Sequence, residues 1–236
     1  MNEQPIEKYV KRQDGKLDVH SIFHTIQGEG PLSGTPAIFI RLAGCNLQCP
    51  LCDTDYTLDR KSLSVNDILF NVINLHEPSY LVVISGGEPF RQDIGELIDT
   101  LWSHNYGVQI ETNGTLPPSD LYSCRYNTTT APELGPMIVC SPKTGKIHLR
   151  IEGNTCAFKY IIADGKVDKD GLPSSVLGHS ARPARPLLGS LVPIYIQPED
   201  SGNAKQNKLN MQQAVKSCME HGYTLQVQLH KIVGIE

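Results

Sequence analysis

The stretch Ala37-Ile-Phe-Ile-Arg-Leu-Ala-Gly-Cys-Asn-Leu-Gln-Cys-Pro-Leu-Cys52 joins a predicted strand to a loop that is rich in cysteine. The strand is apolar apart from Arg41, which is typical of a strand covered on both faces, as in a parallel sheet. A charge at this place fits either a salt bridge or the mouth of an active site. Cys45, Cys49 and Cys52 then follow in the spacing Cys-x-x-x-Cys-x-x-Cys, and thiols at this density indicate a soft metal or an iron–sulfur cluster.

Downstream of the cysteine loop, predicted helices alternate with buried strands. Residues 64–75 keep a helical period of apolar positions, and Ser64 with Asp67 resembles a capping box. Further strands are predicted over residues 80–85, 107–111, 137–141, 158–163, 192–196 and 224–229, and further helices over 94–102 and 207–221. This alternation predicts right-handed βαβ units and a parallel sheet, in which ligands bind beyond the carboxyl ends of the strands.

Two connections between the predicted elements are short of regular structure. Residues 111–137 and 164–190 are rich in Pro, Ser and Gly and leave little room for complete helices. We therefore predict an α/β fold, a partial, open TIM-like β/α barrel with a parallel sheet and truncated helical connections. Residues 18–236 would form one domain, and the polar residues 1–17 a flexible N-terminal arm.

The composition narrows the class of protein. The 236 residues are 39% hydrophobic and 19% charged, as in a soluble globular domain. The net charge of −4 argues against a broad nucleic-acid surface. No apolar run approaches the roughly 18 residues that span a bilayer, and no secretory signal opens the chain. We therefore expect a cytoplasmic protein with no nucleic-acid or membrane partner.

The cysteine loop admits two kinds of centre. A structural zinc site normally closes with four nitrogen or sulfur ligands, whereas the loop offers three and no His follows at finger spacing. Three thiolates on a four-iron cluster leave one iron open to a small molecule. The ligand count therefore favours an open cluster, with structural zinc or a non-catalytic cluster-binding module as alternatives.

Four further cysteines, Cys124, Cys140, Cys156 and Cys218, are scattered along the chain. We expect them to be core or surface thiols, because a disulfide scaffold would be smaller and more evenly studded with cysteine. One of them could still supply a fourth ligand to the cluster.

The segment His24-Thr-Ile-Gln-Gly-Glu-Gly30 follows a short predicted strand at residues 19–23. Gly28 and Gly30 allow a sharp turn and a close approach of the backbone to a ligand. An ordinary turn explains the same glycines, so the loop alone leaves both interpretations open.

Taken in order, several motifs resemble the 7-carboxy-7-deazaguanine synthase family of radical S-adenosylmethionine (SAM) enzymes, which serves queuosine and 7-deazapurine biosynthesis. The motifs are Phe23-His-Thr-Ile-Gln-Gly-Glu-Gly30, Phe39-Ile-Arg-Leu-Ala-Gly-Cys45, Cys49-Pro-Leu-Cys-Asp-Thr54, Ser85-Gly-Gly-Glu-Pro89, Ile110-Glu-Thr-Asn-Gly-Thr115, Ser141-Pro-Lys143, Gln197-Pro198 and Gln228-Leu-His-Lys231. The cysteine spacing is typical of the whole superfamily, and the other motifs are narrower. Ser85 stands where threonine is common in the family and keeps the hydroxyl group.

The resemblance implies a 4Fe-4S cluster on Cys45, Cys49 and Cys52, with SAM on the open iron. The residues implied to bind SAM are Leu51, Cys52, Asp53, Gly86, Gly87, Glu88, Asn113, Ser141, Pro142, Lys143, Gln197, Pro198, Glu199 and Asp200.

The substrate of the family is 6-carboxy-5,6,7,8-tetrahydropterin, whose carboxylate meets a Mg²⁺ ion. The resemblance implies Thr54 as the single protein ligand to this ion and Arg41 as a partner of the substrate carboxylate. The residues implied to bind the substrate are Ile26, Gln27, Gly28, Glu29, Arg41, Ser85, His230 and the C-terminal Glu236.

The implied reaction is that of a carbon–nitrogen lyase. A 5′-deoxyadenosyl radical abstracts hydrogen at C6 of the pterin, and radical ring contraction with loss of ammonia gives 7-carboxy-7-deazaguanine, with no side chain acting as acid or base. A reducing partner such as flavodoxin or ferredoxin, and a homodimer, are expected from the family alone. Another small radical SAM enzyme, of the glycyl-radical activase type, is the alternative that shares the cysteine spacing.

Overall fold

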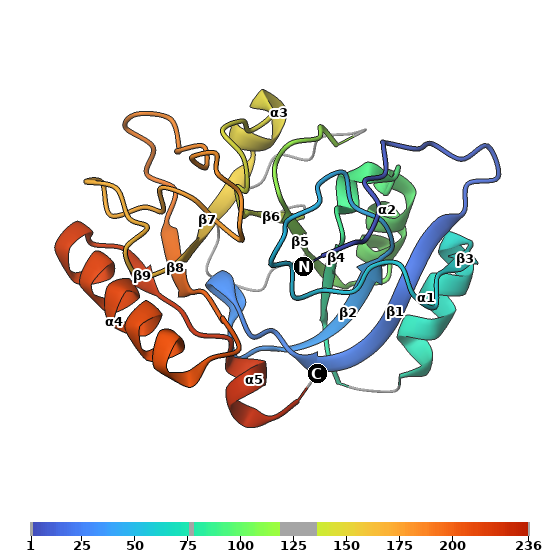
Figure 1. Ribbon diagram of the computed structural model, residues 1–236. Helices are drawn as coiled ribbons and strands as arrows, with labels where there is room; N and C mark the ends of the chain where they lie inside the picture. Colours follow the sequence, from blue (N-terminus) through green and yellow to red (C-terminus); the bar gives the residue numbers. More distant parts are fainter. Residues whose placement is uncertain (1, 76–77, 119–135, 236) are drawn as a thin grey trace.

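The computed structural model describes residues 2–75, 78–118 and 136–235, and a curved sheet lies at its centre (Figure 1). Over these residues the sheet has nine strands in the order β3-β1-β2-β4-β5-β6-β7-β8-β9. The strands are β1 (Leu17–Ile26), β2 (Pro36–Leu42), β3 (Lys61–Leu63), β4 (Leu81–Gly86), β5 (Gly107–Thr112), β6 (Met137–Cys140), β7 (Thr155–Ile162), β8 (Ile194–Pro198) and β9 (Thr224–Leu225). From β2 to β9 every neighbouring pair is parallel, as the alternation of elements predicts.

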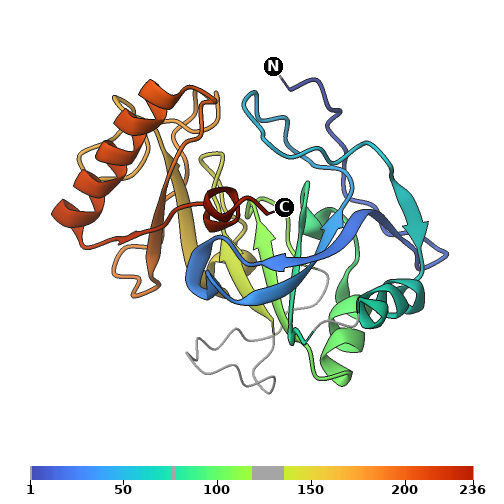
Figure 2. The ribbon, with the colours of Figure 1, turned by 90° about the horizontal axis from the view of Figure 1, so that it is seen from below.

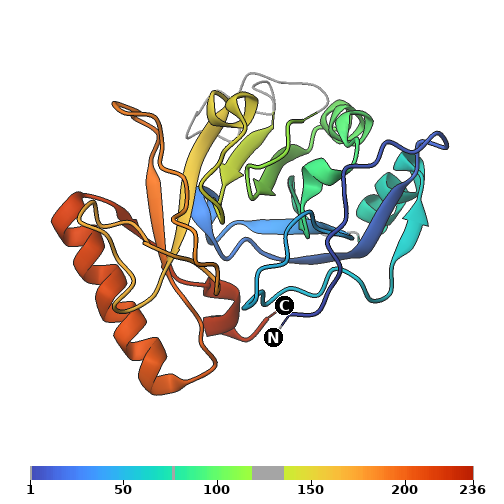
Figure 3. The same ribbon diagram turned by 45° about the horizontal axis from the view of Figure 1, so that its top comes forward.

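The helices lie at the periphery of the sheet (Figure 3). They are α1 (Val65–Asn74), α2 (Gly95–Ser103), α3 (Leu149–Glu152), α4 (Ala204–His221) and α5 (Leu229–Val233), with short 3₁₀ turns η1 (Gly30–Leu32) and η2 (Pro89–Arg91). The predicted capping box is present, because the Ser64 hydroxyl accepts from Asp67 N at 3.1 Å and Ser64 N donates to Asp67 Oδ2 at 3.0 Å. A cap of this kind stabilises a helix start by about 1 kcal/mol.

The core lies between the sheet and the helices. Strands β2 and β4 contribute Ile40 and Ile84, and α2 contributes Leu97 and Leu101, all fully buried. Burial of each such side chain contributes about 2 kcal/mol to the stability of the folded state. The apolar residues of the strands therefore supply much of the energy that favours this fold. No described helix is long and apolar enough to cross a membrane.

The barrel is open, as predicted from the truncated connections. The sheet ends at β3 on one side and at β9 on the other, and α4 packs beside β8 and β9 far from α1 and α2. The last helix, α5, lies between the β8 end of the sheet and the β1–β2 hairpin (Figure 2). Leu229 N donates to Gly28 O at 3.1 Å and ties this helix to the loop after β1.

Two predicted strands differ from the structure. The strand predicted at residues 19–23 extends over Leu17–Ile26 as β1, which is antiparallel to both of its neighbours. The strand predicted at 224–229 is wrong beyond Leu225, because the chain turns into α5. The side chain of Gln226 accounts for the early end of this strand. It accepts a hydrogen bond from Gly30 N and donates one to Gln197, so the chain after Leu225 lies against the loop that follows β1.

Residues 2–12 contact the domain at several points, although their polar composition predicts a flexible arm. Glu7 N donates to Cys45 O at 2.7 Å, and Val10 N donates to Arg91 O at 2.8 Å. These polar residues are engaged in specific hydrogen bonds, which periodicity cannot reveal.

The scattered cysteines divide into two groups. Cys140 and Cys218 are buried free thiols, as predicted. Cys156 is disulfide-bonded and departs from the prediction, and Cys124 lies outside the described residues.

Candidate active site

A cavity of about 470 Å³ opens at the carboxyl ends of the parallel strands. The cysteine loop (residues 44–56) forms one side, and the loop after β1, the end of β7 and the C-terminal segment contribute to the rest. The cavity therefore lies where ligands bind in parallel α/β folds.

Many of the residues predicted for the site line this cavity. They are Ile26, Gln27, Glu29, Arg41, Cys45, Cys49, Cys52, Asp53, Thr54, Ser85, Gly86, Gly87, Asn113, Ser141, Lys143, Gln197 and His230. The structure thus brings together residues that are far apart in the sequence.

The three cysteines of the loop are free thiols on the wall of the cavity. Cys45 and Cys49 are buried and Cys52 is half-buried. Burial, together with the charge of Glu88, raises the pKa of Cys45 to about 12. The thiols are thus protonated at neutral pH unless a metal centre takes up the sulfurs and releases the protons.

The backbone of β4 lies directly against the cysteine loop. Gly87 N donates to Leu42 O at 3.1 Å, and a Cβ atom at Gly87 would overlap the carbonyl oxygen of Gly44. Gly86 has a φ of 122°, a conformation that favours glycine. Both glycines therefore allow this backbone to pack directly on residues 42–45, at the start of the cysteine loop.

No three His, Cys, Asp or Glu side chains among the described residues are placed to share a single metal ion. A 4Fe-4S cluster does not require such convergence, because each thiolate binds a different iron atom. Three free thiols on one cavity wall fit a cluster of this kind.

Glu88 lies beneath the cavity and does not line it. Its carboxylate accepts from the Thr112 hydroxyl at 2.7 Å, from Asn113 N at 2.7 Å and from Phe90 N at 3.1 Å. Burial raises the pKa of Glu88 to about 7, although these three bonds lower it. Glu88 holds the end of β5 against the start of η2, and its contact with SAM, which the resemblance implies, stays a prediction.

The polar wall of the cavity consists of Gln27, Glu29, Glu111, Lys159 and Gln228. The ammonium group of Lys159 binds Glu29 and lies 3.2 Å from Glu111 Oε2. Gln27 donates to Glu111 Oε1 at 2.9 Å, and Gln228 donates to Glu29 Oε1 at 2.9 Å. Four segments of the chain meet in this wall.

The charges of the polar wall are strongly coupled. Burial raises the pKa of Glu29, but Lys159 and the bond from Gln228 outweigh it and lower the pKa to about 2. Burial lowers the pKa of Lys159, but Glu111 and Glu29 raise it well above its usual range. The wall therefore holds two carboxylates and one ammonium, with a formal charge of −1.

Arg41 lies near two aromatic rings at the end of β2. Its guanidinium carbon is 5.1 Å from the centre of the Phe23 ring, and Phe23 stacks on Phe39 with centroids 5.5 Å apart. Ser85 pairs with Arg41 in the neighbouring strand. This cation–π contact fixes the charged end of Arg41 at the cavity, which supports a position at the mouth of the site.

Several predicted residues do not line the cavity. Leu51 is 52% exposed, and Gly28 packs so closely on His230 that a Cβ atom would overlap the imidazole ring. Asp200 lies 3.0 Å from Lys231 in an ion pair. The full set is Gly28, Leu51, Glu88, Pro142, Pro198, Glu199 and Asp200. Glu236 lies outside the described residues, and its neighbour Ile235 lines the cavity.

Three residues of the polar wall were not predicted for the site: Lys159, Glu111 and Gln228. Lys159 is a single cation in the buried strand β7, the same signal that drew attention to Arg41 in β2. Glu111 ends β5 and Gln228 precedes His230, so both lie within quoted motifs without a role assigned to them.

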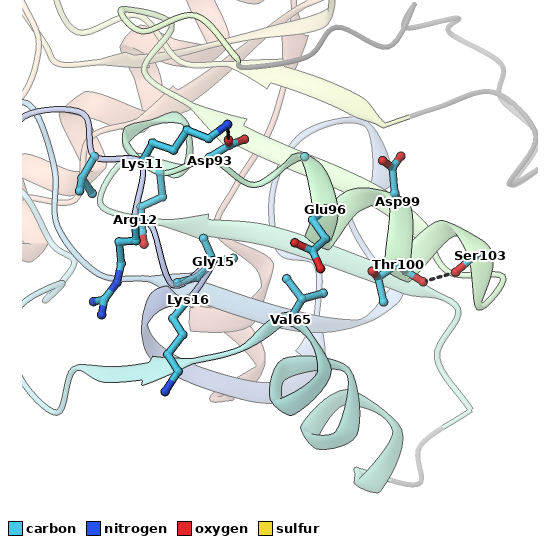
Figure 4. Close-up of a pocket in the computed structure, with 14 residues that line it drawn as sticks. Lys11, Arg12, Gly15, Lys16, Val65, Asp93, Glu96, Asp99, Thr100 and Ser103 are labelled. Atoms are coloured by element: carbon cyan, nitrogen blue, oxygen red, sulfur yellow. Dashed lines mark hydrogen bonds and ion pairs between the residues drawn. The ribbon is translucent and has the colours of Figure 1, made fainter.

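A second cavity of about 600 Å³ lies between residues 10–17 and the start of α2 (Figure 4). It is lined by charged side chains, among them Lys11, Lys16 and Glu96. Lys11 lies 2.6 Å from Asp93, and the Lys11 side chain is 71% exposed. Ion pairs of this kind are screened by water, and none of the cysteines that the structure describes lines this cavity.

A protein-family model and a solved structure are similar to this chain. Residues 39–131 match the Radical SAM superfamily, in agreement with the three-cysteine loop and the parallel sheet. The fold resembles the crystal structure of QueE from Escherichia coli, with a TM-score of 0.68 over 91% of this chain and 95% of that chain at 22% identity. Residues 39–131 thus carry the Radical SAM pattern, and the fold is an open α/β barrel.

Curated relatives narrow the class to one family. The chain is 39% identical to 7-carboxy-7-deazaguanine synthase of Rhodospirillum rubrum, over 94% of both chains. It is 40% identical to the synthase of Rickettsia prowazekii, over 94% of this chain and 89% of the relative, and 31% identical to that of Aquifex aeolicus, over 96% and 98%. The chain belongs to the 7-carboxy-7-deazaguanine synthase family. Membership implies a 4Fe-4S cluster and SAM, and the glycyl-radical activase alternative is set aside.

Proposed function

We propose that this enzyme converts 6-carboxy-5,6,7,8-tetrahydropterin to 7-carboxy-7-deazaguanine, with loss of ammonia. The observation that supports the proposal best is the combination, in one cavity, of three free cysteines and the polar wall around Lys159. A site that only binds a metal does not need a wall of polar side chains, whereas a site for a small substrate with several hydrogen-bond donors and acceptors does.

The cysteine side of the cavity would hold the cofactors. Cys45, Cys49 and Cys52 supply thiolates for the cluster, and the backbone at Gly86 and Gly87 offers polar groups beside them. When bound, the cluster and SAM supply the abstraction of a hydrogen atom from C6 of the pterin. Further polar side chains for SAM are Asn113, Ser141, Lys143 and Gln197.

The polar wall would recognise the amide and amino edge of the pterin. Gln27 and Gln228 each offer an amide oxygen and a second N–H, while Glu29 and Glu111 can accept further bonds. A formal charge of −1 favours a ligand edge that donates hydrogen bonds. Lys159 keeps its proton, because its carboxylate partners raise its pKa, so its role is to neutralise the wall rather than to give up a proton.

The substrate carboxylate would lie toward Arg41 and a Mg²⁺ ion at Thr54. Arg41 can bind a carboxylate through its planar fork. The Thr54 hydroxyl lines the cavity and donates only a long bond of 3.3 Å to Asp53, so it is able to turn toward an ion. Magnesium often binds through few protein atoms, with substrate and water completing its shell.

Partners follow from the same chemistry. The cluster needs an electron from outside, so we include a reducing protein such as flavodoxin or ferredoxin in the proposal. A homodimer is included as the expected assembly.

The test is an anaerobic turnover assay. Reconstituted, reduced protein is incubated with the tetrahydropterin, SAM and Mg²⁺, and 7-carboxy-7-deazaguanine is followed by mass spectrometry. Product should form and should fall with Thr54→Ala, while cleavage of SAM without substrate persists. Absence of product at every Mg²⁺ concentration, from protein that retains its iron, would refute the substrate assignment.

A further inference from the structure

Residues 2–7, which we call the N-terminal strap, run along the cysteine loop. Asn2 N donates to Pro50 O at 3.0 Å, and Glu7 N donates to Cys45 O at 2.7 Å. Ile6 forms a parallel bridge with Cys45. The strap is thus joined by backbone bonds to both ends of the segment that carries the first two thiols.

Gln4 lies at the centre of the strap and joins three points of the loop. Its side-chain oxygen accepts from Tyr56 N at 2.7 Å, and its Nε2 donates to Thr54 O at 2.9 Å. Its backbone oxygen accepts from the side chain of Gln48 at 2.7 Å. A single glutamine therefore satisfies loop groups on both sides of Cys52.

Glu7, at the far end of the strap, forms ion pairs with two arginines beside the loop. Glu7 binds Arg60 and lies 3.2 Å from Arg91, which is 3% exposed. Arg91 in turn donates to Ala43 O at 2.9 Å, just before the loop begins. Charge-assisted hydrogen bonds of this kind are stronger than bonds between neutral groups, so this end of the strap is held firmly beside the start of the loop.

Each cysteine has the strap close by. Cys45 O accepts from Glu7, and Cys49 O accepts from the Asn2 side chain at 3.1 Å. The Cys52 thiol contacts Thr54 O, the same oxygen that Gln4 binds. Backbone bonds outside the strap also hold the loop, among them those from Gly44 N to Tyr56 O and from Leu51 N to Leu177 O.

We propose that the N-terminal strap is a positioning element for the cluster, with Gln4 as its central residue. By fixing the backbone on both sides of the thiols, the strap holds the three sulfurs in the arrangement that retains iron. The inference rests on the proposed role of Cys45, Cys49 and Cys52 as cluster ligands, and it assigns a task to a segment whose composition predicts only a flexible arm.

The experiment compares iron retention in full-length protein that has been reconstituted without oxygen. Gln4→Ala removes the side-chain bonds, and Gln4→Glu keeps the acceptor for Tyr56 N but places an oxygen against Thr54 O. Gln13→Ala is the matched control, because Gln13 is an exposed glutamine that follows the strap in the sequence. Release of iron to an excess of chelator is followed with time, and thermal unfolding of the iron-free protein is measured in parallel.

Gln4→Glu should release iron about fivefold faster than the parent, the factor that corresponds to about 1 kcal/mol for one hydrogen bond. Gln4→Ala loses both side-chain bonds and should release iron faster still. Gln13→Ala should behave like the parent. In both Gln4 variants the faster release of iron should exceed what the change in the unfolding midpoint of the iron-free protein accounts for. Unchanged iron release in both Gln4 variants would overturn the proposal. So would an unfolding midpoint that falls in step with the faster release, since Gln4 would then be a general stabilising residue. Loss of the pterin reaction alone would leave this measurement unaffected and would bear only on the proposed function.

Discussion

The two cavities described above differ in how far water reaches their charged groups, and the smaller cavity has the more buried charges. The larger, of about 600 Å³, is lined by ion pairs that water reaches, such as Lys11 with Asp93 (Figure 4). The smaller, of about 470 Å³, contains Lys159, which is 7% exposed and lies between two carboxylates. A buried ammonium must be paired, since its desolvation costs several kcal/mol. The charges that water does not screen, and not the volume, therefore mark the site.

The largest effect is expected from Lys159→Met. The variant leaves Glu29 and Glu111 without their cation, and the loss of one partner of a buried ion pair costs about 3–5 kcal/mol. The free energy of unfolding should fall by this amount in denaturant titration. Lys231→Met is the matched control, because Lys231 is 40% exposed and lies 3.0 Å from Asp200 in the same region. Its cost should be below about 1 kcal/mol, and equal losses in the two variants would contradict the comparison.

Glu88 gives the next effect, through pH. Because burial raises its pKa from 4.5 to about 7, the folded protein holds this proton more tightly than the unfolded chain. The stabilisation of the folded state by this proton is therefore fully present below pH 4.5 and is lost as pH rises through 7. The free energy of unfolding should fall by about 3 kcal/mol over this range. Unfolding of the iron-free protein, measured from pH 5 to 8, should show this decline.

Glu88→Gln removes the titrating group, so this part of the pH dependence should disappear in the variant. Glu96→Gln, in the second cavity, serves as the control and should keep the parent's pH profile. The same slope in parent and Glu88→Gln would rule out the assigned cause.

A smaller effect is expected from Gln228→Leu, which removes one donor from Glu29. A hydrogen bond to a charged group contributes about 1.5 kcal/mol, so KM for the pterin should rise by about tenfold while kcat changes little. Steady-state kinetics against pterin concentration provide the measurement. Gln212→Leu, at an exposed position on α4, should leave KM unchanged. A fall in kcat alone would argue against a binding role.

The smallest effect is expected in the second cavity. Lys11→Met breaks the pair with Asp93, and exposed pairs contribute about 0–1 kcal/mol. Turnover and iron retention should equal those of the parent. If Lys11→Met lowered turnover as far as Lys159→Met, the second cavity would have to be part of the catalytic machinery.

The sequence predicted those features that depend on neighbouring residues. The cysteine spacing, the capping box at Ser64 and the strand-end motifs are local. The structure contains the capping box and places the three cysteines and many of the motif residues on one cavity. Lys159 could not be assigned from its own segment, because its partners are Glu111 on β5, two strands away in the sheet, and Glu29 in the loop after β1. The strap was missed for a related reason. Gln4 is polar and lies in a segment without periodicity, so only its three-dimensional neighbours show that it is bound.

The wall that joins Glu29 to Gln228 has a consequence for protein synthesis. These partners are 199 positions apart, so at 5–20 residues per second Gln228 is made about 10–40 s after Glu29. The strap and the cysteine loop emerge well before α5 and Ile235, which close the other side. A nascent chain can therefore assemble its thiol loop long before it has a complete pocket, and a ribosome that stalls before α5 leaves a protein with the loop but without the wall.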